Sequence, residues 1–359
     1  MTVPRRVAYI DGLRAVAVLL VVAHHAIVAS AAAPHSLLEN ILRHGNHGVD
    51  LFFVLSGFCL SYPTISALRH EGATVFDTAR YAAHRVVRIV PPYWIAYALV
   101  LAFFVAILKL GFGRPDAMPY YYSTSDFLKQ LFFIDYHTQF LNGSFWTLPI
   151  EFRWYFVFPV LLFVWTRSPF WFFVIGLAAL CLSYAPPGLA DVQALPAFMS
   201  GIIAAELCAR RPRLGPWPAI ATVALGAIAF LTTRSIGWHD GFNPSWYLFA
   251  FAFVVWAGSS QALERVLSLR AIALVGLASY SIYLVHQPVL AFLEEIGLNR
   301  WFAALIAVGA GFAFWALAER PFMSKSNVRR DLVSGFHRFF EVCFSRIGVR
   351  RSVKLNDAA

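Results

Sequence analysis

Charged residues are scarce in this chain, and the scarcity decides its class. Only 13% of its 359 residues are Asp, Glu, Lys or Arg, whereas 59% are hydrophobic. Soluble domains carry roughly 25% charged residues, so this composition excludes an ordinary soluble enzyme. It predicts an all-α integral membrane protein, because helices satisfy their own backbone hydrogen bonds inside lipid.

Cysteines are few and scattered, which excludes two further classes. They show no CxxC or comparable ligand spacing, so neither a disulfide scaffold nor a thiolate metal site is indicated. We therefore expect no metal and no resident cofactor. The cysteines are Cys59, Cys181, Cys208 and Cys343.

Acidic residues are outnumbered, and the net charge is +10. A basic balance can indicate nucleic acid, but here its distribution indicates topology. With a cytoplasmic N-terminus, 22 of the 29 Lys and Arg residues fall on the cytoplasmic side and six on the other. The positive-inside rule then places both termini in the cytoplasm. About ten spans are predicted, at residues 12–33, 48–67, 90–111, 147–166, 169–185, 194–209, 216–233, 245–261, 271–293 and 301–319.

The domain organisation is simple. We predict one polytopic membrane domain, residues 1–321, followed by a short basic cytosolic tail, residues 322–359, that lies against anionic lipid. The N-terminus imitates a secretory signal, with basic residues, an apolar run and small residues. Charged and titratable residues interrupt that run, so we interpret it as an uncleaved first helix.

Two ionisable residues share one face of the first span. Arg14 and His25 are eleven positions apart. In an α-helix this spacing places the two side chains within roughly 20° of the same direction around the axis and about 16 Å apart along it. Such groups are costly in lipid and by default mark a functional interior. A buried, neutral His25 can act as a general base; a hydrogen bond to a helix carbonyl is the alternative. His24 points about 100° away and is the weaker candidate, whereas Asp11 is placed to pair with Arg14.

The second span begins at Gly48-Val-Asp50. Asp50 fits either an acid favoured at a helix N-terminus or a group that orients a substrate hydroxyl. Ser56 and Gly57, in the middle of the same span, are assigned to close helix packing.

Arginines and prolines gather before the third span. Arg85 and Arg88 are three apart, hence on one face if helical. They fit either flanking positive charge or a paired phosphate site, for which the guanidinium fork is suited. The double proline Pro91-Pro92 is expected to stop any helix.

Further ionisable residues lie in the later spans. Glu151 and Arg153 cannot face each other, because residues two apart do not share a helix face, so each needs its own partner. Glu151 is expected to be functional. His286 adds a histidine to the ninth span, and Glu319-Arg320 is interpreted as a surface pair that ends the last one.

Four of these segments, in this order, resemble the membrane acyltransferase-3 family, which includes bacterial O-antigen and exopolysaccharide O-acetyltransferases. A lone Arg–His pair would be weak evidence for this family, but four matching segments in the family's order, spread from residue 11 to about 321, are specific to it. They are Asp11-Gly-Leu-Arg14 with His25, Gly48-Val-Asp-Leu-Phe-Phe-Val-Leu-Ser-Gly57, Phe145-Trp-Thr-Leu-Pro-Ile-Glu151 and Ser279-Tyr-Ser-Ile-Tyr-Leu-Val-His-Gln-Pro288.

The resemblance implies ten membrane helices and transfer of an acyl group, usually acetyl, from cytosolic acyl-CoA to a hydroxyl acceptor, often at the outer face. It implies that His25 is catalytic, that Arg14 belongs to the donor path, and that the loop with Arg85 and Arg88 is essential. Some relatives have a longer Arg cluster there, which this chain lacks. Some carry a C-terminal hydrolase-like domain; without one, we expect this chain to act alone or with a separate partner.

We therefore predict an acyl-CoA-dependent O-acyltransferase of the bacterial inner membrane, with membrane lipids but no nucleic acid as partners. The identity of the acceptor, a glycan or another hydroxyl compound, stays open. The choice between direct transfer and transfer through an acyl-histidine intermediate also stays open. The alternative is a transporter or flippase using the same buried residues as a path, but the sequence shows no inverted repeat or broken helices in matching halves. The assigned roles are His25 and Glu151 in catalysis, Arg14, Arg85 and Arg88 in acyl-CoA binding, and Asp50, Trp146 and His286 on the acceptor side.

Overall fold

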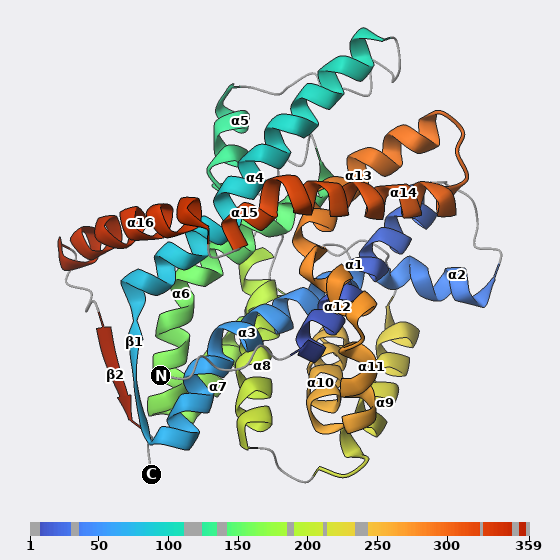
Figure 1. Cartoon of the computed structure of the whole chain (residues 1–359). Helices are drawn as coiled ribbons and strands as arrows, with labels where there is room; N and C mark the ends of the chain where they lie inside the picture. The colour runs from blue at the N-terminus through green and yellow to red at the C-terminus, as the bar shows by residue number, and fades with distance from the viewer. Residues whose placement is uncertain are drawn as a thin grey trace.

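The computed structural model describes residues 8–29, 36–110, 124–134, 142–184, 190–210, 214–233, 243–323, 326–346 and 352–356. Over these ranges the chain is a bundle of helices with a two-stranded ribbon at its edge (Figure 1). The first elements are α1 (Ala8–Ala29), α2 (Leu37–Leu42), η1 (Arg43–His47), α3 (Gly48–Glu71), β1 (Ala73–Asp77), α4 (Thr78–Lys109), α5 (Thr124–Leu131), η3 (Gly143–Trp146), α6 (Thr147–Arg167) and α7 (Pro169–Leu182). The later ones are α8 (Ala190–Arg210), α9 (Trp217–Thr232), α10 (Ser245–Ser259), α11 (Gln261–Leu267), α12 (Arg270–Leu277), α13 (Ser279–Glu295), α14 (Arg300–Phe314), the π-helical turn η4 (Trp315–Glu319), α15 (Arg320–Met323), α16 (Asn327–Arg346) and β2 (Ser352–Asn356).

Several helices are long and apolar enough to cross a membrane, which confirms the multi-pass prediction. Six stretches of the described chain pass this test, and two bent helix pairs raise the number to eight if each pair counts as one span. The helices α7 and α9 are apolar but have only 14 and 16 residues. The ten predicted segments correspond to α1, α3, α4, α6 to α10, the α12–α13 pair, and α14 with η4.

The double proline does not stop a helix, and that prediction is wrong. The helix α4 continues through Pro91 and Pro92, and it begins twelve residues before the predicted span. Prolines are tolerated in membrane helices because side chains of neighbouring helices bond to nearby backbone groups. The two prolines remove the helical donors to the carbonyls of Val87 and Arg88. Next to them, the hydroxyl of Tyr280 in α13 donates to the carbonyl of Ile89, 3.0 Å away, which ties this part of α4 to a neighbouring helix. Arg85 and Arg88 therefore project from a continuous helix rather than from a loop.

The predicted ninth span is broken. The helices α12 and α13 meet at a bend of 69°, and a bend of 100° separates α10 from α11. Close packing at Gly276 fixes the first of these: a Cβ there would lie 1.7 Å from the carbonyl oxygen of Asp11 in α1. Both bends follow residue 244, so they are not the matched broken helices of an inverted-repeat transporter.

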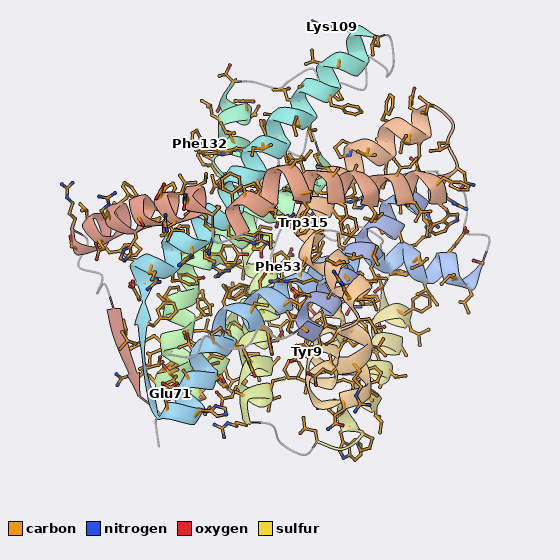
Figure 2. All side chains as sticks on the ribbon, viewed as in Figure 1. Tyr9, Phe53, Glu71, Lys109, Phe132 and Trp315 are labelled. Carbon is orange, nitrogen blue, oxygen red and sulfur yellow. The ribbon has the colours of Figure 1, made fainter. Side chains whose placement is uncertain are left out.

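The helix α1 lies amid the bundle and contacts α3, α11, α12, α13 and α14. Beside it, α3 packs against α8 through two glycines. A Cβ on Gly57 would lie 2.0 Å from the carbonyl oxygen of Phe198, and one on Gly201 would lie 2.1 Å from that of Val54. This confirms the packing role of Gly57. Phe53 of α3 is 2% exposed and lies near the middle of the molecule in Figure 2.

The residues after 321 form more structure than the predicted tail. The helix α16 packs against α4, and β2 pairs antiparallel with β1, with Leu355 opposite Thr74 (Figure 1). Leu355 is 2% exposed. The predominantly helical class is confirmed. The ribbon is an addition that hydropathy did not predict, because two five-residue strands with mixed composition carry little signal on their own.

Candidate active site

Three cavities are lined by five of the predicted site residues, Arg14, His25, Arg85, Arg88 and Glu151. The first, of about 870 Å³ and here called the arginine vestibule, lies between α1, α3, α4 and the start of α16. The second, the central cavity of about 90 Å³, lies between α1, α3, α4, α6 and α13. The third, the histidine cavity of about 670 Å³, opens beside α1 and the end of α13. The first two share three lining residues, Arg14, Arg85 and Arg88, which therefore stand where these cavities meet.

Arg14 is held by two contacts. Its Nη1 lies 3.7 Å from Oδ1 of Asp11, which confirms the predicted pair, and its Nη2 donates to Sγ of Cys59 at 3.5 Å. Arg85 and Arg88 line the same two cavities, as their spacing on one helix face predicts. The Nε of Arg85 is buried and has no hydrogen-bond partner among the described residues. Arg85 thus has one donor, its Nε–H, that a ligand can satisfy.

Arg88 has a partner that the sequence did not reveal. Its Nη1 forms a short ion pair with Glu319, whose other carboxylate oxygen accepts from Ser281 of α13. Glu319 is completely buried, so its interpretation as half of a surface pair is wrong. The π-helical turn η4 packs against α4 and α13 and presents Glu319 to both. A buried charge needs such an opposite partner.

The central cavity contains one carboxylate, Glu151. Its Oε1 accepts hydrogen bonds from Ser56, at 2.5 Å, and from the hydroxyl of Tyr155. Ser56 thus lines the cavity and joins α3 to α6 through its hydroxyl, a polar contact that the packing assignment did not include. Thr147 and Tyr283, which also line this cavity, join their hydroxyls at 2.9 Å.

His25 and His286 come together from α1 and α13. Nδ1 of His25 lies 2.9 Å from the carbonyl oxygen of Val21 and 3.2 Å from Nε2 of His286. A carbonyl only accepts, so Nδ1 of His25 carries the proton. Nδ1 of His286 faces the carbonyl of Tyr283 at 2.9 Å in the same way, which makes its Nε2 the acceptor. Nε2 of a neutral His25 thus keeps its lone pair, as a general base requires.

The carbonyl contact of His25 and a role in catalysis are therefore compatible, because they use different ring nitrogens. His24 is occupied differently: its Nδ1 lies 2.5 Å from the carbonyl oxygen of Arg43. This agrees with its lower rank.

The residues just before α6 are hydrogen-bonded to α13 around His286. Asn142 donates to the carbonyl of Leu284, and the backbone N–H of Ser144 donates to Oε1 of Gln287 at 2.8 Å. The hydroxyl of Ser144 also lies 3.5 Å from Nε2 of His286. Ser144 and Gln287 were not predicted as site residues. Their presence in the Asn-Gly-Ser and His-Gln-Pro segments is the only sequence signal that points to them.

The histidine cavity combines polar ends with an apolar wall. His25 and Gln287 line it together with Glu294, Glu295 and Arg300. Arg300 donates to Glu39 at 2.7 Å. Oε1 of Glu294 is buried and has no hydrogen-bond partner in the part of the chain that the structure describes. Cavities of this size with a few convergent polar groups are typical of small-ligand sites.

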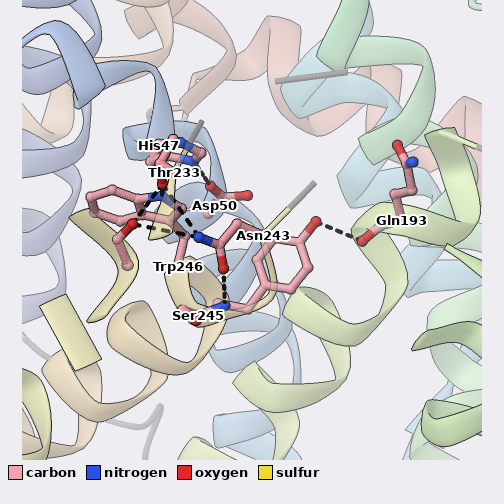
Figure 3. A network of polar contacts seen from close by, with 9 residues as sticks. His47, Asp50, Gln193, Thr233, Asn243, Ser245 and Trp246 are labelled. Carbon is pink, nitrogen blue, oxygen red and sulfur yellow. Dashed lines mark hydrogen bonds and ion pairs between the residues drawn. The ribbon is translucent and has the colours of Figure 1, made fainter. Parts of the chain in front are cut away.

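Two predicted acceptor-side residues lie elsewhere. Asp50 is buried and accepts from Nδ1 of His47 at 2.6 Å, and the His47 ring stacks on Trp246 (Figure 3). Trp146, at the start of α6, packs against the hydrophobic core. Neither residue lines any of the three cavities.

Arg153 has its own partner, as its spacing from Glu151 requires. It bonds to Asp191 of α8 at 2.8 Å and to the carbonyl of Phe133 at 3.1 Å. Over the described ranges, no three His, Cys, Asp or Glu side chains are grouped as a metal site would need.

Comparison with known proteins identifies the family of the chain. Residues 7–320 match the acyltransferase-3 family model, described as an acyltransferase domain. The exopolysaccharide production protein ExoZ of Rhizobium meliloti (strain 1021) is 28% identical over 317 residues, which cover 80% of this chain and 92% of ExoZ. No solved structure matches the chain.

Two further relatives are longer proteins. The peptidoglycan O-acetyltransferase OatA of Listeria monocytogenes is 26% identical over 376 residues, covering 92% of this chain and 57% of that protein. The O-acetyltransferase OatA of Staphylococcus aureus (strain NCTC 8325) is 25% identical over 337 residues, covering 81% and 52%. The chain therefore spans just over half the length of these two relatives.

Proposed function

The chain belongs to the acyltransferase-3 family and is a multi-pass membrane acyltransferase, and on that premise we propose that it moves an acetyl group from acyl-CoA to a hydroxyl of a cell-envelope glycan. The proposed location is the bacterial inner membrane, with both termini in the cytoplasm. In this topology α7, α9 and α10 are the shortest of ten spans, and the arginine vestibule faces the cytoplasm.

The observation that carries the proposal is the shared lining of two cavities. Arg14, Arg85 and Arg88 line both the arginine vestibule and the central cavity. Guanidinium groups suit phosphates because their forked donors match phosphate oxygens. A donor whose phosphates lie at these arginines directs its acyl arm into the central cavity. Arg85 is the best placed of the three, because Arg88 also serves Glu319.

The reaction proceeds by attack of the acceptor hydroxyl on the thioester carbonyl. Nε2 of His25 takes the hydroxyl proton as the new C–O bond forms. The C–S bond then breaks, and the thiolate of CoA recovers that proton from the imidazolium. Attack by His25 itself, giving an acyl-histidine that the hydroxyl then cleaves, is the covalent variant of the same proposal.

The acceptor is proposed to enter through the histidine cavity. Two relatives of this chain are named for O-acetylation, one of them for O-acetylation of peptidoglycan, and a third is named for exopolysaccharide production. These names support a glycan as the acceptor. Glu294 presents a buried carboxylate oxygen that a sugar hydroxyl would satisfy. Glu151 is proposed to balance the positive charge of the three arginines rather than to touch the acceptor.

The test is acetyl transfer by the purified protein. Wild type, His25→Ala and the neighbouring control His24→Ala receive radiolabelled acetyl-CoA and an envelope-glycan extract, and both CoA release and label in the glycan fraction are measured. Loss of a general base should slow transfer by about 10²–10⁴-fold. His24→Ala should stay within a few-fold of wild type.

Two outcomes would count against the proposal. Near-normal transfer by His25→Ala would remove the assigned base. Uptake of an unmodified glycan into proteoliposomes without acyl-CoA, and with no release of CoA, would support the transporter alternative instead.

A further inference from the structure

The arginine vestibule holds more positive charge than the three shared arginines supply. Two further arginines line it without reaching the central cavity: Arg80 of α4 and Arg329 of α16. His84 lies between them on the wall and receives a hydrogen bond at Nδ1 from Nη2 of Arg329, 3.1 Å away. The group therefore joins two parts of the chain 245 residues apart.

Acidic groups are outnumbered among the described residues that line the vestibule, where five arginines face two aspartates; Arg88 also pairs with Glu319 outside this lining. Asp11 and Asp77 are the acids that line the vestibule. Asp11 lies beside Arg14, and Oδ1 of Asp77 accepts the backbone N–H of Arg80 at 2.8 Å. Burial and the like charges of Arg85 and Arg88 lower the pKa of Arg329 from its ordinary value. Crowded cations of this kind gain from an anionic ligand.

The position of Arg329 is built into the fold. Its backbone N–H donates to Oγ of Ser326 at 3.1 Å, and that hydroxyl donates to the carbonyl of Pro321 at 2.6 Å. Farther along α16, His337 lies 3.7 Å from Asp77 and Phe340 packs against Phe156 of α6. Arg329 therefore lines the vestibule from a helix that is held at its start and again along its length.

We propose that Arg80, His84 and Arg329 form a phosphomonoester-binding subsite, here called the tail subsite, that takes the ribose 3′-phosphate of the acyl-CoA donor. The inference rests on the proposed function. Acyl-CoA carries its pyrophosphate between the acyl arm and the 3′-phosphate. If the arm enters the central cavity, the pyrophosphate lies at the three shared arginines. The 3′-phosphate then falls farther out, where residues line the vestibule alone.

Anionic lipid headgroups offer similar phosphate chemistry, so the experiment must separate the two sources. Binding of CoA and of 3′-dephospho-CoA is measured by calorimetry in neutral detergent, for wild type, Arg329→Gln, Arg80→Gln and Arg330→Gln. Arg330 is the matched control, since it is exposed, bonds to Asn327 of its own helix at 2.8 Å and does not line the vestibule. Monodispersity and thermal unfolding confirm that each variant is folded.

The expected result is selective. Wild type binds CoA at least tenfold more tightly than 3′-dephospho-CoA, because one or two charged hydrogen bonds to the 3′-phosphate raise the affinity by at least that factor. Arg329→Gln weakens CoA binding about tenfold and leaves 3′-dephospho-CoA within about twofold. Arg80→Gln acts in the same direction, and Arg330→Gln changes neither affinity.

Three results would overturn the tail subsite. In the first, wild type binds both nucleotides equally, which leaves the proposed donor intact but removes the subsite. In the second, Arg329→Gln and Arg330→Gln weaken binding alike, which reduces the effect to general charge. In the third, Arg329→Gln alters only association with vesicles that contain phosphatidylglycerol, which assigns the arginine to lipid. A wild type that binds neither nucleotide would contradict the acyl-CoA donor itself.

Discussion

His25 and His286 face each other with Nδ1 and Nε2 3.2 Å apart, although 261 residues separate them in the chain. The contact uses the protonated nitrogen of His25 and leaves the other nitrogen for a substrate proton. His286 is completely buried and does not line the histidine cavity. Its geometry is that of a positioning residue, which differs from the acceptor-side role that the sequence suggested.

Removal of His286 should therefore change turnover more than binding. In His286→Ala the ring of His25 keeps only its bond to Val21, and a lost orienting hydrogen bond of about 1.5 kcal/mol corresponds to roughly tenfold in rate. We expect kcat to fall by about that factor, with KM for acceptor and donor near wild type. Steady-state kinetics on both substrates make the measurement. An increased acceptor KM with unchanged kcat would instead return His286 to acceptor binding.

Glu319 should prove structural as well as electrostatic. Glu319→Ala leaves Arg88 without its buried partner, and breaking such a pair costs about 3–5 kcal/mol. We expect a clear loss of thermal stability in detergent, measured by intrinsic fluorescence. The double variant Arg88→Met with Glu319→Met removes both charges and should recover much of that loss. Equal destabilisation of the single and double variants would show that the ion pair is not the cause.

Glu151 should be required for its charge. Glu151→Gln preserves shape but removes the only carboxylate among the described residues that line the central cavity, which Arg14 and Arg85 also line. Charge-assisted bonds of about 1.5–3 kcal/mol are lost, so we expect kcat/KM at least tenfold lower. Tyr155→Phe removes one hydroxyl and keeps the carboxylate and its bond to Ser56. Acetyl transfer by this control should stay within a few-fold of wild type, and a larger loss in the control than in Glu151→Gln would contradict the assignment.

The α3–α8 contact gives a prediction about stability alone. A Cβ on Gly57 would lie 2.0 Å from the backbone of α8, so Gly57→Ala must separate the helices at a cost of about 1–3 kcal/mol. Gly309 of α14 is the control, because nothing lies within 4 Å of its added Cβ. Gly309→Ala should leave Tm unchanged or raise it, since Ala favours a helix by about 1 kcal/mol. A Tm of Gly57→Ala equal to wild type would mean that α3 and α8 do not pack this closely.

Local patterns predicted the parts of the site that a single helix determines. Arg14 lies near Asp11 because residues three apart share a helix face. Arg85 and Arg88 line one pair of cavities for the same reason. The separate partners of Glu151 and Arg153 also follow from helix geometry, which keeps positions two apart from meeting.

Patterns failed where a residue's environment comes from distant helices. Glu319 reads as a surface acid at a span's end, yet Arg88, 231 residues away, and Ser281 bury it. Ser56 reads as a small packing residue, yet Glu151 of α6 binds it. Asp50 reads as a candidate for the acceptor side, yet it is buried and accepts from His47, whose ring stacks on Trp246 (Figure 3).

The sequence by itself determined the membrane class and the continuous first helix that carries Arg14 and His25, because apolar composition and the 3.6-residue period act within one segment. The tertiary structure alone decided that α4 continues through two prolines, that His286 contacts His25, and that α16 brings Arg329 to the arginine vestibule. These features depend on hydrogen bonds and ion pairs between segments far apart in the chain. Such partners become neighbours only when the helices pack, and the high cost of an unpaired polar group inside the bundle then selects them.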